Sequence, residues 1–428
     1  MKKTTRFISL ICAVIFIFSA CSGENEVNIT FQDNPVDRDN YVSDVKDPGV
    51  ERKDEYLLSP KLSRDEIRLA LDYVMSKVDE NVTVFVDKYP RCYGDDLTYP
   101  KVDNTGWTEG FYIGMIWLAY EYTGDVKYKH IATKHCDAMR ERLENNIVLE
   151  HHDLGFLYYP SCVKGYMLTG DEKMKDTALK AADKLLTRYN EKGKYIQAWG
   201  EFGAVEESRL IIDTMMNLEL LYWASEESGD KKYFDVANEH AKTTAIVIMR
   251  DDASTHHTFY INPETGNPSH GVTDQGLNDD TAWSRGQAWG IYGFNISYKH
   301  TRNPIFMEEG TKITNYFLNH LPKDNIAYWD LSFTDAPEPR DTSAAAIAAS
   351  GLIDNYKYYD NEYKDIYLGA AHQILKTLSQ KYTTRGAYSN AVLREGVYAY
   401  HHKLGINASL IWGDYYYMEA LMKLLEMS

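Results

Sequence analysis

One junction occurs three times along this chain, as Thr123-Gly124-Asp125-Val126-Lys127-Tyr128, Thr169-Gly170-Asp171-Glu172-Lys173-Met174 and Ser228-Gly229-Asp230-Lys231-Lys232-Tyr233. In each copy the glycine is placed to end one helix in the left-handed conformation, and the aspartate is placed to cap the next helix. Looser versions follow at Thr301 to Pro304 and at Tyr359 to Asn361. The repeat predicts a series of helical hairpins.

Helical periodicity between these junctions predicts about twelve helices. They are expected at 64–78, 109–122, 126–144, 157–168, 171–188, 207–227, 230–249, 283–300, 305–320, 342–358, 361–382 and 408–426. Some stretches, such as Phe111 to Tyr122, are apolar nearly all round, whereas others, such as 126–144, carry one apolar stripe. Because all-round apolar helices are buried and striped helices face water, we expect an all-α fold, an (α/α)6 barrel with an inner and an outer ring. An open solenoid of hairpins is the alternative.

The N-terminus has the form of an export signal. Three basic residues precede an apolar run from Phe7 to Phe18, and Ser19 and Ala20 then lead to Cys21. The run is too short to span a bilayer as a helix, and small residues before a cysteine are typical of a bacterial lipobox. We expect residues 1–20 to be a lipoprotein signal peptide and Cys21 to be the lipidated first residue. The protein would then be exported to the periplasm or the outer-membrane surface, although an ordinary cleaved signal peptide remains an alternative.

Composition divides the rest of the chain into a tether and one domain. Residues 21–57 are rich in Asp, Glu, Asn and Lys, which predicts a flexible tether, and 58–428 has no linker-like break. The formal net charge of −17 excludes the electrostatic footprint of a nucleic-acid-binding protein, while a local cationic pocket can still hold a short anionic ligand. The thiols have no spacing typical of a disulfide framework or a zinc site; they are Cys92, Cys136 and Cys162.

An acidic residue interrupts one of the apolar stretches. Within 207–227, Arg209, Asp213 and Asn217 recur at four-residue spacing, so on a helix they would share one face that reaches only the central cavity. A carboxyl group in such surroundings tends to have a raised pKa, which a general acid needs. A solvated stripe with an Arg209–Asp213 ion pair is the structural alternative.

Two further polar segments border apolar helices. Asp153 precedes the apolar run that starts at Leu154, where its simplest role is to cap the next helix. Arg285 lies in the first turn of the helix expected at 283–300, where the helix dipole disfavours a cation. A bound anion would resolve this conflict, so we expect Arg285 and the helix N–H groups to hold a carboxylate. Trp289 would then support a sugar ring. Aromatic core packing with Arg285 paired to an aspartate at 279 or 280 is equally open. The chain has three His-His pairs, at 151–152, 256–257 and 401–402. Adjacent histidines do not have the spacing of typical metal ligands, so no metal is expected.

Several segments carry the strongest functional signal. In chain order they are Trp107-Thr108-Glu109-Gly110-Phe111, His152-Asp153-Leu154-Gly155-Phe156, Ile212-Asp213-Thr214-Met215-Met216-Asn217, Trp283-Ser284-Arg285-Gly286-Gln287-Ala288-Trp289, Asp341-Thr342-Ser343-Ala344-Ala345 and Trp412-Gly413-Asp414-Tyr415-Tyr416-Tyr417. Together they resemble glycoside hydrolase family 88, the unsaturated glucuronyl hydrolases. The resemblance implies an (α/α)6 barrel, no metal or organic cofactor, and a substrate that carries a 4,5-unsaturated uronic acid left by a polysaccharide lyase.

The resemblance also implies a role for individual residues. Asp213 matches the general acid and base, and Asp153 matches the second catalytic acid. Other positions match residues that bind the uronate and its ring or line the site with aromatic side chains; they are Trp107, Trp199, His257, Gln275, Arg285 and Trp289. The segment Tyr400-His401-His402-Lys403-Leu404 departs from the family pattern. We expect its His401, His402 and Lys403 to form a cationic rim for the second sugar.

Two other functions remain open from the sequence. The family 105 unsaturated rhamnogalacturonyl hydrolases share the barrel, although the His-Asp-Leu-Gly-Phe run favours family 88. A helical surface lipoprotein that only binds glycans would need aromatic residues and arginine, but not two carboxylates facing one cavity. The sequence leaves open the source polysaccharide, its sulfation and the oligomeric state.

We predict that the anchor and the chemistry are separable. Cys21→Ala should release or misprocess the protein, while a purified domain from about Arg52 onward should stay active, because the lipid contributes location and not chemistry. Cell fractionation checks the location of the Cys21→Ala variant, and an activity assay checks the truncated protein. A truncated domain that is folded but inactive would show that the tether assignment is wrong.

Overall fold

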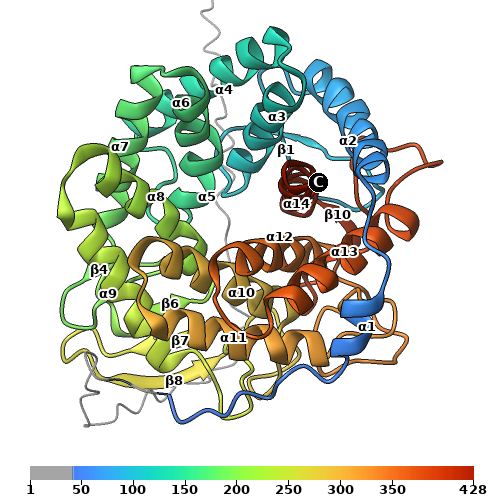
Figure 1. Cartoon of the computed structure of the whole chain (residues 1–428). Helices are drawn as coiled ribbons and strands as arrows, with labels where there is room; N and C mark the ends of the chain where they lie inside the picture. Colours follow the sequence, from blue (N-terminus) through green and yellow to red (C-terminus); the bar gives the residue numbers. More distant parts are fainter. Residues whose placement is uncertain (1–40, 42) are drawn as a thin grey trace, which may run out of the picture.

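The inner helices of the barrel form a closed ring in the computed structural model, which describes residue 41 and residues 43–428. They are α3 Glu109–Thr123, the continuous segment α5 Leu154–Tyr158, η1 Tyr159–Val163 and α6 Lys164–Thr169, then α8 Thr214–Ser228, α10 Ser284–Thr301, α12 Thr342–Tyr358 and α14 Ile411–Met427. Each contacts the next, and α14 returns to contact α3, so the ring is closed rather than an open solenoid (Figure 1). The predicted (α/α)6 barrel is confirmed.

The outer helices alternate with the inner ones along the chain and surround them (Figure 1). They are α2 Arg64–Val84, α4 Val126–Glu144, α7 Glu172–Leu186, α9 Lys231–Val247, α11 Pro304–Asn319 and α13 Lys364–Lys381. No described helix is both long and apolar enough to cross a membrane. The inner segment after Leu154 becomes π-helical around Pro160, which has no N–H to donate to the regular helical ladder.

The repeated junction makes the short turns of the barrel. Gly124, Gly170 and Gly229 are all left-handed, with φ of 70°, 70° and 74°. The aspartate that follows each glycine accepts a hydrogen bond from a backbone N–H of the next helix, for example from Lys127 N to Asp125 Oδ1 at 2.9 Å. These three turns connect α3, α6 and α8 to the outer helices that follow them, so they lie at the same end of the barrel.

The long connections lie at the other end, where each outer helix leads to the start of the next inner helix. They contain short antiparallel strands: β1 Tyr89–Pro90, β2 Tyr93–Gly94, β3 Lys101–Val102, β4 Tyr189–Asn190, β5 Tyr195–Ile196, β6 Arg209–Ile211, β7 Thr258–Ile261, β8 Pro268–Val272, β9 Gly396–Ala399 and β10 Leu404–Leu410. They pair as β1-β3, β2-β10-β9, β4-β5 and β6-β7-β8. The 3-10 turn η2 Val205–Glu207 precedes β6. The described chain therefore has only small sheets, as its periodicity predicts.

Part of the segment assigned to the tether belongs to the folded body. Residues 53–58 form α1, and Tyr56 is buried against α13. Asp47 accepts hydrogen bonds from Asn315 Nδ2 at 2.8 Å and from Tyr363 OH at 2.9 Å. The prediction that the tether extends to residue 57 is therefore wrong at its C-terminal end. Cys21, the signal peptide and the start of the tether lie outside the described residues.

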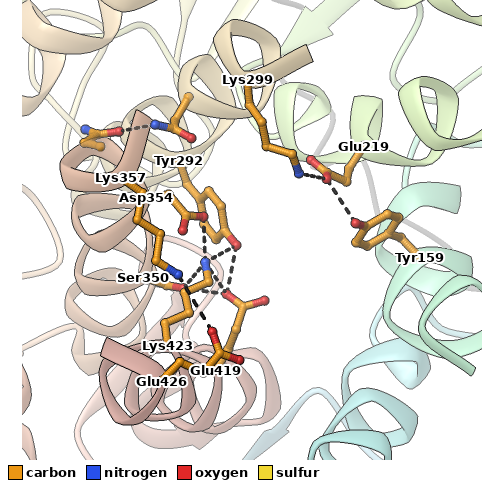
Figure 2. Close-up of polar contacts among 12 residues, drawn as sticks. Tyr159, Glu219, Tyr292, Lys299, Ser350, Asp354, Lys357, Glu419, Lys423 and Glu426 are labelled. Carbon is orange, nitrogen blue, oxygen red and sulfur yellow. Dashed lines mark hydrogen bonds and ion pairs between the residues drawn. The ribbon is translucent and has the colours of Figure 1, made fainter. Parts of the chain in front are cut away.

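Buried charges join the inner helices toward the end of the short turns (Figure 2). Lys423 Nζ on α14 lies 2.7 Å from Asp354 Oδ2 on α12, 3.4 Å from Glu419 Oε2, and donates to Tyr292 OH on α10. Across the ring, Glu219 on α8 accepts from Lys299 Nζ at 2.7 Å and from Tyr159 OH at 3.0 Å. These contacts tie neighbouring inner helices together through side chains from five separate segments.

We predict that removing one charge from this network destabilises the barrel. Lys423→Met leaves Asp354 and Glu419, whose side chains are only 13% and 17% exposed, as uncompensated carboxylates, which should cost about 3 to 5 kcal/mol of unfolding free energy. Chemical denaturation measures the change. The matched control is Lys127→Met, because its ion pair with Asp79 is about half exposed and should matter little. Equal, small effects of both substitutions would contradict a structural role for the network.

Candidate active site

The sequence-predicted acids meet at the end of the barrel that carries the long connections. Asp153 directly precedes α5, and Asp213 directly precedes α8. His152 lies between them, with Nε2 3.4 Å from Asp153 Oδ1 and 3.6 Å from Asp213 Oδ1. His151 Nδ1 lies 3.2 Å from the other oxygen of Asp153. The two carboxyl groups therefore share one histidine.

Close contact between the starts of α5 and α8 sets this geometry. Gly155 has no room for a side chain, because a Cβ there would lie 2.3 Å from Asn217 Cα. Asn217 Oδ1 accepts a hydrogen bond from Phe156 N at 2.8 Å, which clamps the first turn of α5 to α8. His152 Nδ1 lies 2.6 Å from Thr214 Oγ1, which orients the ring, and the backbone N–H of His152 donates to Ala198 O, which fixes the main chain. Asn217, expected to face the cavity, is instead fully buried in this clamp.

The two acids have opposite pKa shifts. Burial and the adjacent charge of Asp153 raise the pKa of Asp213 well above its ordinary value. Burial also acts on Asp153, but its interactions with His152 and His151 outweigh burial and leave its pKa below the ordinary value. Burial lowers the pKa of His152 to about 4, so this ring is neutral near pH 7. The opposite shifts favour a proton on Asp213 and a negative charge on Asp153, which is the arrangement that general acid catalysis requires.

The helix expected at 207–227 starts later than predicted. Residues 209–211 form strand β6, in which Arg209 pairs with Tyr260 of β7, and α8 begins only at Thr214. Arg209 therefore does not share a helical face with Asp213. Its guanidinium pairs with Glu207 Oε2 at 2.8 Å, which also excludes the Arg209–Asp213 ion pair considered as an alternative.

Arg285 starts α10 as expected, but its partners differ from the predicted aspartates. It pairs with Asp341 Oδ2 at 2.9 Å and donates to Gln275 Oε1 and to the backbone oxygens of Val397 and Tyr398. Asp341 caps α12 and accepts from Ser343 Oγ at 2.6 Å. Arg285 thus joins α10, α12 and the β9 strand below the site. Neither Asp279 nor Asp280 pairs with it, so that alternative is wrong.

His257 and Gln275 lie on the β7 and β8 side of the site. His257 Nδ1 accepts a hydrogen bond from Asp274 N at 3.0 Å, and its backbone oxygen accepts from Ile212 N beside Asp213. Burial lowers the pKa of His257 to about 4. Because Nδ1 is an acceptor in a neutral ring, the proton is on Nε2, and His257 is a hydrogen-bond donor.

The predicted aromatic residues differ in exposure. Trp289 is buried between Phe156 and Tyr416, with ring centroids at 5.1 and 5.5 Å, so it packs beneath the acids, as in the core-packing alternative. Trp107 is partly buried against Trp412 at 5.1 Å. Trp199 is 38% exposed and meets the His152 ring edge-on at 5.9 Å. Of these three, Trp199 offers the largest surface to a sugar.

The segment 400–404 reaches the site from the β9–β10 hairpin. His401 Nε2 lies 2.7 Å from Gly276 O, and His402 Nε2 lies 3.0 Å from Asp274 Oδ1. Lys403 is exposed with φ +55°, a left-handed conformation at the tip of the hairpin. The hairpin therefore stands beside residues 274–277, adjacent to His257.

Sequence reasoning missed Thr214, Asp341 and Tyr398, which orient His152 and Arg285. Thr214 and Asp341 lie within two of the family-like segments of the sequence. A polar residue at the start of an apolar helix was the pattern that could have predicted their roles. His152, Asp153 and Asp213 also offer ligand atoms within 4.8 Å of one another, so they are the set within the described chain that could hold a metal ion. The proton that the raised pKa keeps on Asp213 competes with such binding.

Comparisons with known proteins agree with this geometry. Residues 77–427 match the family model of Glycosyl Hydrolase Family 88. An unsaturated chondroitin disaccharide hydrolase from Streptococcus pneumoniae is 44% identical over 381 residues, which covers 87% of this chain and 96% of the relative. An unsaturated glucuronyl hydrolase from Bacillus sp. (strain GL1) is 40% identical over 351 residues, covering 80% and 93%. The crystal structure of unsaturated glucuronyl hydrolase from Streptococcus agalactiae has a TM-score of 0.89 at 43% identity and covers 91% of this chain and 99% of that one.

The barrel and its acid pair define a glycoside hydrolase of the (α/α)6 class. The chain belongs to glycosyl hydrolase family 88. Membership favours the enzyme over a glycan-binding lipoprotein without activity, and family 88 over family 105.

We predict that the Asp153 charge sets the alkaline limit of activity. Asp213 must be protonated to act as an acid, so kcat/KM should fall as pH rises through its pKa. In Asp153→Asn the neighbouring negative charge is absent, the pKa of Asp213 falls, and the alkaline limb of the residual activity should move to lower pH. A kcat/KM profile against pH measures this, with Asp103→Asn, an exposed acid, as control. An unchanged or alkaline-shifted limb would contradict the assignment.

Proposed function

We propose that this enzyme removes a 4,5-unsaturated uronic acid from the non-reducing end of lyase-generated disaccharides of the chondroitin type. The relatives with 44% identity, from three Streptococcus species, are named unsaturated chondroitin disaccharide hydrolases. The Streptococcus agalactiae structures include a complex with dGlcA-GalNAc6S, at 40% identity to this chain. A structure described as specific for heparin is only 33% identical, which favours a chondroitin-type substrate over a heparin-type one.

The observation that carries the mechanism is the position of the two acids at one nitrogen of His152, where the pKa of Asp213 is raised and that of Asp153 is lowered. In the proposed first step, protonated Asp213 transfers its proton to C4 of the double bond, and positive charge develops at C5 and the ring oxygen. Water then adds at C5 and returns a proton to the Asp213 carboxylate. The resulting hemiketal opens and expels the next sugar from C1. This reaction is hydration of a vinyl ether, so the carboxylate spacing of ordinary glycosidases does not apply.

Neighbouring residues have proposed roles in holding the substrate. The ionised Asp153 would stabilise the positive charge that develops after protonation and keep the proton affinity of Asp213 high. His257 would donate from Nε2 to the uronate carboxylate. Gln275 accepts from Arg285 through Oε1, which leaves its amide N–H groups to donate to the same carboxylate.

The second sugar is proposed to lie between Trp199 and the hairpin that carries His401 and Lys403. Trp199 is 38% exposed, which leaves aromatic surface that a sugar could contact. Lys403 would supply the cationic rim for a sulfate or carboxylate. The two histidines, expected as part of that rim, are proposed to support the hairpin instead, because His402 is next to Asp274 and His401 is next to backbone oxygens.

The proposed location remains that of an exported lipoprotein anchored through Cys21. The apolar run and lipobox pattern at the N-terminus support it. Such an anchor would place the enzyme where oligosaccharides released by lyases arrive.

A panel of unsaturated disaccharides tests the substrate. Disaccharides from chondroitin, hyaluronan, heparin and algal polymers are incubated with the enzyme, and turnover is followed as loss of the conjugated ultraviolet absorbance. We expect the highest kcat/KM on a chondroitin-type disaccharide. A clear preference for the heparin-derived substrate would contradict the proposed specificity.

We predict that Asp213→Asn abolishes turnover while folding and binding persist. Asparagine keeps the shape and removes a buried ionisable group, but it cannot protonate C4. The loss in kcat should be at least about 10² to 10⁴, because one group serves both proton transfers. Kinetics and calorimetric binding of the disaccharide measure the two effects. Near-normal kcat would exclude Asp213 as the acid. In the double variant the losses of kcat from Asp153→Asn and Asp213→Asn should not add, because the two acids act on one site.

A further inference from the structure

Arg142 on the outer helix α4 is a buried cation whose N–H groups all have partners. The residue is 1% exposed, and its Nη1 lies 3.4 Å from Glu109 Oε2, so its charge is paired inside the protein. The remaining N–H groups donate to four oxygens of two connections, at 3.2, 2.8, 3.0 and 2.9 Å: Asn104 Oδ1, Gly106 O, Ile147 O and Val148 O. Because a guanidinium has five N–H donors, none is left over. Arg142 therefore joins the connection before α3, which carries Trp107, to the connection before α5, which carries Asp153.

The connection before α5 has a backbone conformation that its own residues disfavour. Asn146 and Val148 are left-handed, with φ of 48° and 49°. For a β-branched residue such as valine this conformation is strained, so contacts with other residues must hold it. The Val148 side chain is 56% exposed, whereas its backbone oxygen accepts from Arg142. Ile147 also donates from its N–H to Arg142 O at 3.0 Å. Arg142 thus fixes the strained turn at 146–148.

The carbonyl oxygen of Val148 also contacts His151, which lies beside the acid pair. His151 Nε2 is 3.1 Å from Val148 O, and because a carbonyl oxygen can only accept, Nε2 carries a proton. The other ring nitrogen, Nδ1, accepts from Asp153 N at 3.1 Å and lies 3.2 Å from Asp153 Oδ2. Contacts through Val148 O and His151 therefore lead from the outer helix to Asp153.

We propose that Arg142 is a positioning residue for the reaction and acts on Asp153 through Val148 O and His151. Arg142 fixes the turn, the turn orients the His151 ring, and the ring holds both the backbone and one oxygen of Asp153. This inference rests on the proposed function, in which ionised Asp153 keeps the proton affinity of Asp213 high. Because every N–H of Arg142 is used within the protein, its loss should lower kcat and leave KM nearly unchanged.

A double-mutant cycle tests this series of contacts. Arg142→Lys keeps the buried charge but lacks the fork that reaches Gly106 O and Val148 O together, and His151→Ala removes the ring. Each should lower kcat on an unsaturated chondroitin disaccharide by about tenfold to a hundredfold, because a small displacement of a reacting group has a large effect on rate. The double variant should lose no more than the larger single loss, since both residues act through one contact.

Lys312→Met is the matched control, because Lys312 also belongs to a buried ion pair on an outer helix. Its Nζ lies 3.0 Å from Glu309 Oε1 within α11, and the two side chains are 11% and 1% exposed. Lys312→Met should lower the midpoint of chemical denaturation but leave the parent kcat unchanged. If Arg142→Lys does not fold, Glu109→Gln replaces it in the cycle. Glutamine keeps an oxygen for Gly106 N and removes the charge opposite Arg142.

Unchanged kcat in folded Arg142→Lys, or losses that multiply in the double variant, would overturn the proposal. Asp153→Asn separates this result from failure of the proposed function. If Asp153→Asn retains the parent kcat, the role of Asp153 is wrong, and the proposal fails with it. If Asp153→Asn loses kcat while the losses from Arg142→Lys and His151→Ala multiply, only the link through Val148 O is wrong.

Discussion

The chemistry of this enzyme depends on one close contact, between the starts of helices α5 and α8. Gly155 lets the backbones approach, and Asn217 closes the gap with a hydrogen bond to Phe156 N. The contact brings Asp153 and Asp213 to the same ring nitrogen, Nε2, of one buried histidine, His152. If the helices stood further apart, the charge of Asp153 would act on Asp213 through water, and the Coulomb interaction that separates their pKa values would be weak.

The barrel separates stability from chemistry by using its two ends differently. Inner helices run in the same direction, so all of their N-termini lie at the end with the long connections, and those connections have room for strands and binding residues. At the other end the connections are short, and three of them are Gly-Asp turns. The charged groups of Lys423, Glu419 and Asp354 satisfy one another there and join α12 to α14 (Figure 2). The active site can therefore keep polar atoms without a hydrogen-bond partner, such as Asp213 Oδ1, because the stability of the ring does not depend on pairing them.

Local signals explain what the sequence could predict. Gly124 and Asp125 act within one turn, so the hairpins and the ring followed from the chain alone, and Asp213 stood out because its neighbours are apolar. Non-local pairing explains the errors. Arg209 lies in a strand because β7, about fifty residues later, pairs with it. Arg285 pairs with Asp341 rather than with nearer aspartates, and Asp47 is held by α11 and a tyrosine before α13. No local pattern reveals such partners.

The different proton affinities of the two acids arise from their partners rather than from their positions. Both precede the N-terminus of a helix, where the dipole favours a carboxylate by roughly 0.3 to 1 kcal/mol, and both are buried, which disfavours it. Asp153 has two histidines beside it, and these keep it ionised. Asp213 Oδ1 has no hydrogen-bond partner among the described residues, so burial and the charge of Asp153 prevail. Arg285 and the N–H groups at the start of α8 act in the opposite direction and stabilise the carboxylate once the proton has left. In the proposed reaction Asp213 would therefore hold its proton until substrate arrives, give it up at C4, and take another from water.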